Sequence, residues 1–448
     1  MKESNYNIWL SPGPGVVLCY NAITGGFAEM DEGTYKQFKN AYHQDKNSNE
    51  VDEQLLDNFK KGGMLIDNNL DEDEMLKCRF LQSSYGSRAL GLTILPTLDC
   101  NFKCNYCYEK NKFSSMSDDV VKAIKDFISN KIKNDHIEAI FVSWFGGEPL
   151  LELNKIIDIS KYIIDLCNKN SISYSSHMVS NCSLLDNDKA KLLSDLKISE
   201  IQATIDGPRV IHDKRRIFKN GNPTFDKILG NILASSEYVK FAVRINTDKY
   251  FLNTCNELFD NITPLARKEN IGIYPGKLSS DVTLTCSNIE SMCLNVKEFA
   301  DIYKLFYSKA ISSGFNLSWK PHSTPGGCGA TNIHSMVIEP NGNLCRCWSQ
   351  VGEEDESYGN ILNFNTSFKP NNYYKWLLFD PFSIHECLRC KFKPLCMGGC
   401  PATRVNATTD YMAGNNKRAD KCSPIKYNLN DMLLFVYDQI KSNSKNGG

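Results

Sequence analysis

Three cysteines stand close together in the segment DCNFKCNYCYEK, residues 99–110. They are Cys100, Cys104 and Cys107, in a C-x3-C-x2-C spacing. Three thiolates on one tight loop can ligate three irons of a [4Fe–4S] cube and leave the fourth iron without a protein ligand, open for chemistry. A structural zinc site needs four closed ligands, so three thiols with no histidine nearby favour the cluster over zinc.

The surroundings of this loop predict its place in a fold. An apolar, β-rich run at Leu92–Leu95 precedes it, and a helical pattern from Met116 to Ile132 follows it. The cysteines are then expected at the carboxyl end of a parallel strand, where barrel enzymes hold their active sites. With Tyr106 as the aromatic residue, the C-x3-C-x-aromatic-C pattern resembles the signature of the radical S-adenosylmethionine (SAM) superfamily.

This resemblance implies a cofactor chemistry. In the family, the amino and carboxylate groups of SAM chelate the open iron, and one electron cleaves a C–S bond to release a 5′-deoxyadenosyl radical. The resemblance therefore assigns a SAM-binding [4Fe–4S] cluster to Cys100, Cys104 and Cys107. A flavodoxin- or ferredoxin-type electron donor is the expected redox partner.

Composition narrows the class of protein further. The chain has 448 residues, enough for two or three domains, and an ordinary hydrophobic content of 42%. Its 51 basic and 52 acidic residues are interspersed, so we expect neither nucleic acid nor a membrane surface as a partner. Without an apolar signal core or a run of ~20 apolar residues, a cytoplasmic protein is expected, and its 18 cysteines then indicate metal binding rather than disulfides.

Residues 1–88 are predicted to form a small α+β domain. The turn-rich stretch Ser11–Gly15 between two apolar runs indicates a hairpin, and a third strand follows at Gly26–Met30. Helices at Tyr35–His43 and Val51–Lys61 and a short strand at Met64–Ile66 complete the unit. Three strands and then helices, ahead of a radical SAM core, resemble the peptide-recognition domain of peptide maturases. The alternative is a cap on the barrel that binds no ligand.

Strands and helices alternate between residues 89 and 293, which we assign to the radical SAM core. The six predicted strands are Gly91–Leu98, Glu138–Trp144, Tyr174–Ser180, Glu200–Ile205, Phe241–Asn246 and Gly272–Pro275. Six β/α units make an open parallel barrel. The expected fold class is therefore α/β, in agreement with the partial (β/α)6 TIM-type barrel of the family.

The second predicted strand ends in a glycine-rich turn. Phe145 is followed by Gly146, Gly147, Glu148 and Pro149. This stretch resembles the family motif whose backbone and carboxylate bind the SAM amino group, and glycine lets backbone approach a ligand closely. Gly-Gly-Glu-Pro alone is a common turn, but in combination with the three cysteines it is specific.

The next two strands end in residues that the resemblance also assigns to SAM or substrate. Ser180 and Asn181 resemble the stretch that meets the SAM ribose and methionyl carboxylate, although Cys182 stands where glycine is usual. Thr204 and Asp206 are expected to face the cavity. The alternative for Asp206 is a cap of the following turn.

Arg244, in the fifth predicted strand, has two interpretations. Its guanidinium can reach the SAM carboxylate, or it can form a buried ion pair. The predicted cofactor-binding residues are in sum Tyr106, Gly146, Gly147, Glu148, Pro149, Ser180, Asn181, Thr204, Asp206 and Arg244.

A second collection of cysteines lies in residues 294–448. A helical pattern at Val296–Ser313 and a predicted strand at Phe315–Pro321 precede a hairpin, Ser335–Cys347, turned at Asn341-Gly342. The cysteines follow C-x13-G-x4-C, then C-x2-C-x5-C-x3-C, then a last C. Seven positions match the SPASM extension of radical SAM enzymes: Cys328, Cys347, Cys387, Cys390, Cys396, Cys400 and Cys422. Zinc ribbons share the C-x2-C pairs, but agreement at seven positions favours clusters.

Seven cysteines are one short of the eight ligands of two auxiliary [4Fe–4S] clusters. The resemblance assigns four of them to a distal cluster: Cys387, Cys390, Cys396 and Cys422. It assigns the other three to a nearer cluster: Cys328, Cys347 and Cys400. The eighth ligand is left open between Cys345, His322, a thiolate of the substrate and no ligand at all. Three clusters in total are expected.

The combined pattern resembles maturases of ribosomally made peptides. These enzymes abstract a hydrogen atom from a peptide and form a thioether or C–C bond, so we expect thioether crosslinking of a Cys-containing precursor peptide with a leader. The alternatives are a C–C crosslinking or epimerising maturase, an anaerobic sulfatase-maturing enzyme, and a noncatalytic metal- or redox-sensing protein. An Asp after the second SPASM cysteine is the proposed base of sulfatase maturases, but here Trp348 follows Cys347. A noncatalytic protein would leave Gly146–Pro149 and Tyr106 without a purpose.

Overall fold

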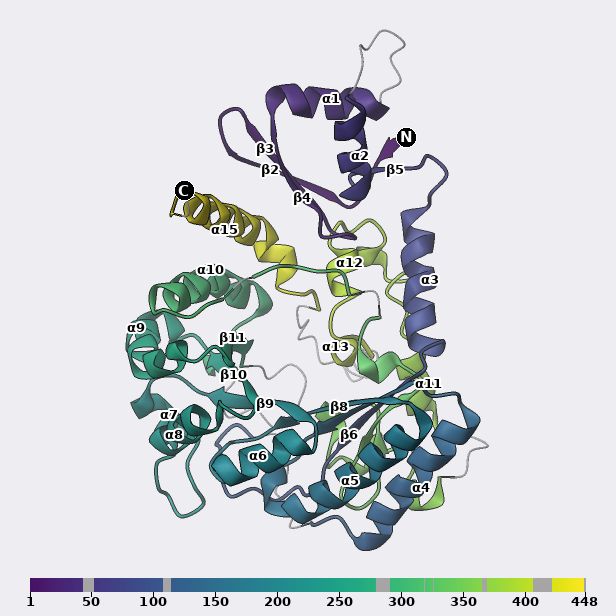
Figure 1. The fold of residues 1–448 in the computed structure, drawn as a ribbon, viewed down its shortest axis with the longest axis vertical. Coiled ribbons are helices and arrows are strands. Elements are labelled where there is room, and N and C mark those ends of the chain that lie inside the picture. Colours follow the sequence, from purple (N-terminus) through teal and green to yellow (C-terminus); the bar gives the residue numbers. More distant parts are fainter. Residues whose placement is uncertain are drawn as a thin grey trace.

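The computed structural model describes residues 1–42, 52–107, 114–278, 291–317, 319–324, 326–364, 369–405 and 421–446. Three parts follow one another along its longest axis (Figure 1). A small sheet with two helices lies at one end and a large sheet covered by helices at the other, and the cysteine-rich segments lie between them. No helix among these described residues is long and apolar enough to cross a membrane.

An eight-stranded sheet forms the large part, in the order β11-β10-β9-β8-β7-β6-β12-β13. Its parallel strands are β6 Ala89–Ile94, β7 Ala139–Trp144, β8 Ser173–Val179, β9 Ile198–Ile205, β10 Lys240–Thr247 and β11 Ile271–Lys277, with β12 Ser335–Ile338. From β6 to β11 the spatial order follows the chain, as in the wall of an open barrel. The expected α/β class with a parallel, partial barrel is confirmed.

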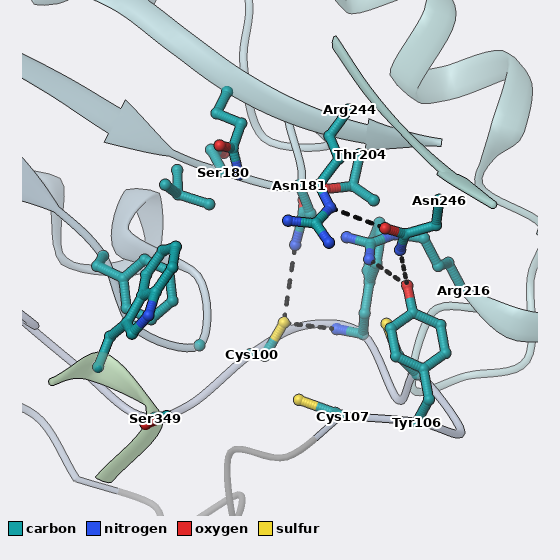
Figure 2. A pocket seen from close by; sticks show the side chains of 18 of the residues that line it. Cys100, Tyr106, Cys107, Ser180, Asn181, Thr204, Arg216, Arg244, Asn246 and Ser349 are labelled. Carbon is teal, nitrogen blue, oxygen red and sulfur yellow. Dashed lines mark hydrogen bonds between the residues drawn. The ribbon is translucent and has the colours of Figure 1, made fainter. Parts of the chain in front are cut away.

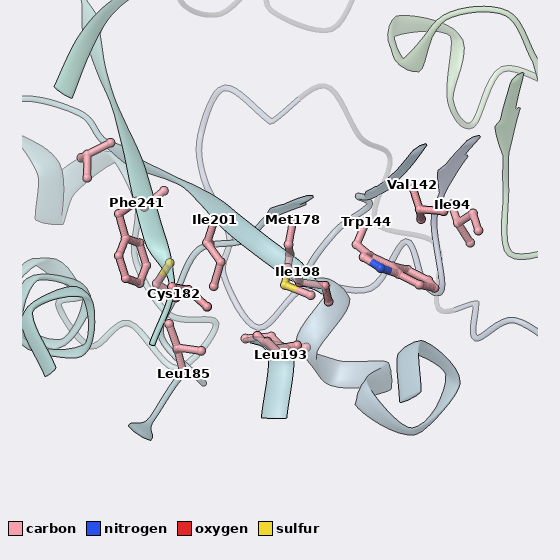
Figure 3. Packing of buried hydrophobic residues seen from close by; sticks show 14 of the residues in the cluster. Ile94, Val142, Trp144, Met178, Cys182, Leu185, Leu193, Ile198, Ile201 and Phe241 are labelled. Carbon is pink, nitrogen blue, oxygen red and sulfur yellow. The ribbon is translucent and has the colours of Figure 1, made fainter. Parts of the chain in front are cut away.

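Helices between the strands cover the outer face of this sheet. They are α4 Asp118–Asn134, α5 Leu153–Asn170, α6 Asn187–Asp195, α7 Arg209–Arg215, α8 Phe225–Ser235 and α9 Phe251–Ile262. Side chains alternate along each strand, so Val142 and Trp144 of β7 are buried in the core beneath the helices (Figure 3), whereas Phe141 is exposed on the inner face. The inner face of the sheet is therefore the face that can carry a functional site.

The N-terminal sheet has the strand order β2-β3-β4. Its elements are β2 Asn7–Gly13, β3 Val16–Asn21, β4 Phe27–Asp31, α1 Glu32–Tyr42 and α2 Glu53–Lys61, with β1 Lys2–Glu3 paired to β5 Leu65–Ile66. The predicted hairpin, third strand and two helices are present. His43 and Val51, at the predicted helix ends, lie outside the described residues.

A helix that the sequence analysis does not predict, α3 Glu72–Tyr85, connects this unit to β6. Its apolar residues are spread around the helix, and only a narrow face with Leu76 and Phe80 is buried, so the helical pattern in the sequence is weak. The missed signal is the cap, because the Asp71 side chain accepts hydrogen bonds from the backbone N–H of Asp73 and Glu74.

The C-terminal region extends the barrel sheet. β12 pairs in parallel with β6, with Ser335 opposite Gly91, and β13 Leu344–Cys345 pairs antiparallel with β12. The predicted hairpin is therefore present, and Gly342 takes the left-handed conformation at its turn, with φ of 86°. The helices of this region are α10 Val296–Ser312, α11 Asn371–Leu377, α12 Lys393–Cys396, α13 Pro401–Val405 and α15 Ile425–Asn446.

The strand predicted at Phe315–Pro321 is wrong, since residues 315–317 and 319–321 carry no strand. This segment leads from α10 toward the N-terminal sheet, where the Tyr20 hydroxyl donates to the Pro321 carbonyl at 2.9 Å. Its apolar residues therefore reflect packing between parts of the molecule rather than a place in a sheet.

The N-terminal sheet packs directly on the cysteine-rich segments (Figure 1). Tyr6, Ile8 and Tyr20 form a buried cluster with Leu395 and Met397. In consequence the N-terminal part is not an independent appendage.

Candidate active site

The cysteine loop that follows β6 is fastened by a segment far away in the sequence. The backbone N–H of Lys103 donates to Ile217 O at 2.9 Å. Phe102 and Phe218 form an antiparallel bridge, and their rings pack edge to face with centroids 5.0 Å apart. The segment that follows α7, with Ile217 and Phe218, therefore positions the loop.

Two amide groups donate to the sulfur of Cys100. Asn181 Nδ2 lies 3.7 Å and the backbone nitrogen of Phe102 lies 3.4 Å from Cys100 Sγ. Burial raises the pKa of the Cys100 thiol to about 12, so its thiolate needs a bound cation and such donors. None of the described cysteines forms a disulfide. Three thiols on one loop, with amide donors at a sulfur, fit the ligand set of an iron–sulfur cluster.

A cavity of about 410 Å³ opens beside these thiols (Figure 2). Its wall contains all three loop cysteines and seven of the predicted SAM-binding residues: Tyr106, Gly146, Gly147, Ser180, Asn181, Thr204 and Arg244. Cys347 and Cys400 line the same cavity. Glu148, Pro149 and Asp206 are buried behind the wall.

The two glycines after β7 are required by close packing within the chain, which the sequence did not reveal. A Cβ at Gly146 would stand 2.3 Å from Thr97 O, and a Cβ at Gly147 would stand 2.2 Å from Asp99 O. Glu148 N donates to Asp99 O at 2.8 Å. Glycine is thus required for this turn to approach the backbone that leads into the cysteine loop, in addition to any approach to a ligand.

Glu148 joins two neighbouring strand ends. Its carboxylate accepts hydrogen bonds from the Ser180 hydroxyl at 2.9 Å and from the Asn181 backbone N–H at 2.7 Å. It is fully buried, and burial raises its pKa while these bonds oppose the shift. The geometry gives Glu148 the task of holding the Ser180–Asn181 backbone at the cavity wall.

Cys182 adopts the backbone conformation that glycine would favour. Its φ is 60°, and its side chain is fully buried. The left-handed turn is therefore kept although the residue carries a side chain, at a cost of about 1–2 kcal/mol for a non-glycine residue. Position 182 therefore keeps the left-handed backbone that glycine would favour.

A buried polar network lies behind Tyr106. The Tyr106 hydroxyl donates to Asp206 and accepts from Arg216 Nη1 at 2.8 Å. Asn246 Nδ2 donates to Asp206 Oδ1 at 2.6 Å. Asp206 does not face the cavity as predicted; instead it anchors three residues that do, so its burial is explained by this network.

Arg244 extends into the cavity from β10 (Figure 2). Its Nε donates to Asn246 Oδ1 at 2.8 Å and its Nη2 to Lys277 O at 3.0 Å. Among the described residues no carboxylate pairs with Arg244, so the buried ion pair is not formed. The side chain crosses Gly276, where a Cβ would stand 2.3 Å from Arg244 Nε.

Cys328, Cys347 and Cys400 form a group, and Cys347 and Cys400 of this group line the cavity. Cys347 packs with Ala330 and Ala402, each two residues beyond one of the other cysteines. Burial raises the pKa of Cys347 to about 11, and the neighbouring thiols of Cys328 and Cys400 add to this shift.

The candidates for an eighth ligand lie elsewhere. Cys345 is fully buried with Leu95 and Phe145, and its thiol donates to Glu339 Oε1 at 3.4 Å. His322 is exposed, and its Nδ1 lies 3.4 Å from Lys320 O. The Cys345 thiol interacts electrostatically with that of Cys347, but its hydrogen bond goes to Glu339. In the described residues no contact joins His322 to the three thiols.

Four further thiols gather near α12, namely Cys387, Cys390, Cys396 and Cys422. Burial raises the pKa of Cys396, and the thiols of Cys390 and Cys422 contribute in the same direction. Among the described residues no three such side chains converge closely enough to bind one metal ion. A cube does not need such convergence, because each ligand binds a separate iron. The ligand roles stay a prediction.

Several cavity residues were missed by sequence reasoning: Gln202, Arg216, Asn246, Lys277, Trp348 and Ser349. Gln202 and Asn246 carry a weak signal, since they alternate with buried residues on predicted strands. Trp348 and Ser349 reach the cavity from a distant part of the chain, where their position depends on tertiary packing.

Residues 94–257 match the model of the radical SAM superfamily, so this part of the chain is a radical SAM domain. The chain is 24% identical to the cysteine-type anaerobic sulfatase-maturating enzyme of Clostridium perfringens, over 70% of this chain and 90% of that protein. It is 21% identical to the radical SAM cyclopropyl synthase TigE of Paramaledivibacter caminithermalis, over 85% of each chain. It is also 32% identical to an uncharacterised protein of Methanocaldococcus jannaschii, over 34% of this chain and 51% of that protein.

Two solved structures share the fold. The structure of anSMEcpe with bound AdoMet has a TM-score of 0.58 at 19% identity, covering 80% of this chain and 100% of that chain. Streptococcus suis SuiB bound to its precursor peptide SuiA has a TM-score of 0.50 at 15% identity, covering 94% and 98%. At these identities the likeness concerns the fold alone.

We predict that Gly147→Ala destabilises the protein by about 1–3 kcal/mol, because its Cβ would overlap the Asp99 carbonyl. Gly230→Ala is the matched control, since Gly230 lies within α8 with nothing within 4 Å of its Cβ position. That control should gain about 0.5–1 kcal/mol. Denaturant unfolding measures both, and equal effects of the two substitutions would contradict the steric account.

Proposed function

We propose that this radical SAM enzyme matures a ribosomally made peptide by forming a thioether between a cysteine sulfur and a carbon atom. The observation that carries the proposal is the cavity, because one space is lined both by the Cys100–Cys107 loop and by Cys347 and Cys400. The proposed SAM site and the proposed nearer cluster thus face the same substrate.

In this proposal three [4Fe–4S] clusters and SAM are the cofactors. Cys100, Cys104 and Cys107 would hold the SAM-binding cluster, and the two C-terminal groups of cysteines would hold auxiliary clusters. When bound, SAM and its cluster supply a 5′-deoxyadenosyl radical that abstracts a hydrogen atom. A flavodoxin- or ferredoxin-type donor in the cytoplasm would reduce the enzyme.

The residues of the cavity wall would bind and orient SAM. Arg244 offers a guanidinium to the SAM carboxylate, and Thr204 offers a hydroxyl to its polar groups. Phe145 and Trp348 pack with ring centroids 5.3 Å apart and form an apolar side that keeps water out. The polar side would hold SAM, and the apolar side would meet the peptide.

A positively charged cavity favours thioether formation over formylglycine formation. The described lining residues include the cations Arg244, Lys277 and Arg216, the last of which pairs with buried Asp206 at 3.8 Å, but no aspartate, glutamate or histidine. Cations stabilise a thiolate, which is the nucleophile of C–S bond formation. Trp348 occupies the position where the sulfatase maturases place their proposed base, which disfavours that activity despite the relatives of this name.

Residues 1–88 would bind the leader of the peptide at the edge of the N-terminal sheet. β4 pairs with β3 on one side and with no other described strand. In an antiparallel pair, residues that hydrogen-bond to the partner strand alternate with residues whose N–H and C=O groups point away from it. Because Asn21 N donates to Gly26 O at 2.8 Å, the N–H and C=O groups of Phe27 and Glu29 point away from β3. An extended leader can pair with these groups, and SuiB in its complex has a bound precursor peptide.

The reaction is tested with the enzyme and a Cys-containing peptide encoded by a neighbouring short reading frame. Thioether formation removes two hydrogen atoms from the peptide and abolishes alkylation of its cysteine, and mass spectrometry detects both changes. A product that has lost its sulfur would favour a sulfatase maturase instead. An unchanged peptide beside abundant 5′-deoxyadenosine would reject this peptide class.

Replacing Cys100, Cys104 and Cys107 together by Ala should abolish SAM cleavage and lower the iron content by about one third, because one of three equal clusters is lost. Iron analysis and 5′-deoxyadenosine formation in anaerobically purified protein measure this. Cys78→Ala, at an exposed position outside all three groups, is the control and should change neither. Formation of 5′-deoxyadenosine by the triple variant would refute the assignment.

Gly276→Ala should weaken SAM binding at least about tenfold, because the new Cβ displaces Arg244 and costs ~1.4 kcal/mol or more of binding free energy. Gly272→Ala on the same strand is the control, since its nearest atom lies at 3.9 Å. Equilibrium dialysis with SAM compares them. Equal affinity in the two variants would remove Arg244 from the SAM site.

Glu29→Pro should weaken leader binding, because proline removes an outward N–H of β4. Glu29→Ala is the matched control: it loses the same ion pair with Lys441 but keeps the N–H. Fluorescence anisotropy of a labelled leader measures both. If the two variants bind the leader equally well, the β4 edge is not its site.

A further inference from the structure

Arg346 is a buried cation whose charge no acidic side chain neutralises. Its side chain is 4% exposed. The guanidinium makes four hydrogen bonds, all to main-chain carbonyls, those of Ala330, Asn332 and Ser335. Within the described residues no aspartate or glutamate forms an ion pair with it. A buried charge is costly without an opposite charge nearby, so the site lacks its counter-ion.

The position of Arg346 indicates where that counter-ion lies. Arg346 directly precedes Cys347, and its hydrogen bonds hold the turn that follows Cys328. Cys347 in turn packs against Ala330 of that turn. The guanidinium therefore lies between the two chain segments that bring Cys328 and Cys347 together.

The other groups around Arg346 do not supply a negative charge. Tyr373 packs its ring 5.4 Å from the guanidinium carbon and is neutral. The Glu339 carboxylate accepts a hydrogen bond from the Cys345 thiol, and the Glu356 carboxylate accepts one from Gln350 Nε2. Neither carboxylate forms an ion pair with Arg346 in the described part of the chain. The thiols of Cys328, Cys347 and Cys400 are left as the source of compensating charge.

A second buried cation in the cysteine-rich region provides a contrast. Lys393 is 2% exposed, and its ammonium pairs with Asp73 Oδ1 at 2.7 Å. The fold thus neutralises one buried cation with a carboxylate and leaves the other to the thiols. The lack of a paired carboxylate is therefore specific to Arg346 and is not shared by Lys393.

We propose that Arg346 is the counter-charge of the iron–sulfur cluster at Cys328, Cys347 and Cys400, and that it raises the reduction potential of that cluster. The proposal rests on the proposed function, which places a cluster there. A cluster with thiolate ligands becomes more negative on reduction, and a nearby cation stabilises the reduced form. A raised potential suits a site that takes up the one electron released when a thiolate bonds to a carbon radical.

The test uses the anaerobically purified, full-length enzyme with its clusters. The variants Arg346→Met and Arg346→Lys are compared with the parent by iron analysis and by redox titration followed by electron paramagnetic resonance. The triple Ala variant of Cys328, Cys347 and Cys400 identifies the signal of the nearer cluster. Arg88→Met is the matched control, because Arg88 is exposed and pairs with Glu138 at the surface.

In Arg346→Met we expect the equilibrium constant for reduction of the nearer cluster to fall about tenfold, which is 59 mV for a one-electron couple. Arg346→Lys should retain most of the parental potential, because lysine keeps the positive charge. It lacks the planar guanidinium, so some of the hydrogen bonds are lost. Arg88→Met should leave the potential unchanged.

Two outcomes would overturn the proposal. Equal potentials in the Lys and Met variants would show that the charge is not felt by the cluster. Loss of the cluster from both variants would assign Arg346 a purely structural task of holding the turn after Cys328. A triple Ala variant that loses no iron is a different result, because it would refute the proposed cluster itself.

Discussion

The pairing of β12 with β6 is the constraint on which the site depends. It joins the cysteine-rich region to the barrel by main-chain hydrogen bonds, which set one register. The parallel register sets Ser335 opposite Gly91, and this close approach tolerates no bulky residue, because a Cβ at Gly91 would stand 2.8 Å from Ser335 Oγ. Since main-chain hydrogen bonds fix this register, Cys345 packs on Phe145 and the Trp348 ring reaches the cavity.

Buried acids hold the cavity wall in place without lining it. Glu148 fixes the ends of β7 and β8 to one another, and Asp206 fixes Tyr106 of the cysteine loop to Asn246 of β10. Each carboxylate accepts several hydrogen bonds, so its burial is stabilised and its side chain is held in one geometry. The rigid positions that ligands require are thus set by residues that need not touch them.

The sequence predicted those features that depend on local spacing. The C-x3-C-x2-C loop and the alternation of strands and helices need only neighbouring residues, and the radical SAM assignment follows from them. The predictions fail where tertiary contacts decide, as at Asp206, which lies behind the wall, and at Phe315–Pro321, which forms no strand. Trp348 could not be placed, because its contact with Phe145 joins residues from distant parts of the chain.

The distribution of charge in the cavity connects the fold to the proposed chemistry. Arg244 and Lys277 come from adjacent strands, and Trp348 comes from the C-terminal region. A cationic side attracts the carboxylate of SAM and stabilises a thiolate, whereas an apolar side strengthens these interactions by excluding water. Since the described lining contains no carboxylate, it offers a substrate thiol no acidic side chain as a base. Its cations would lower the pKa of that thiol, and the proton would pass to solvent. The C-terminal region therefore forms part of the cavity wall through Trp348, in addition to any metal that it holds.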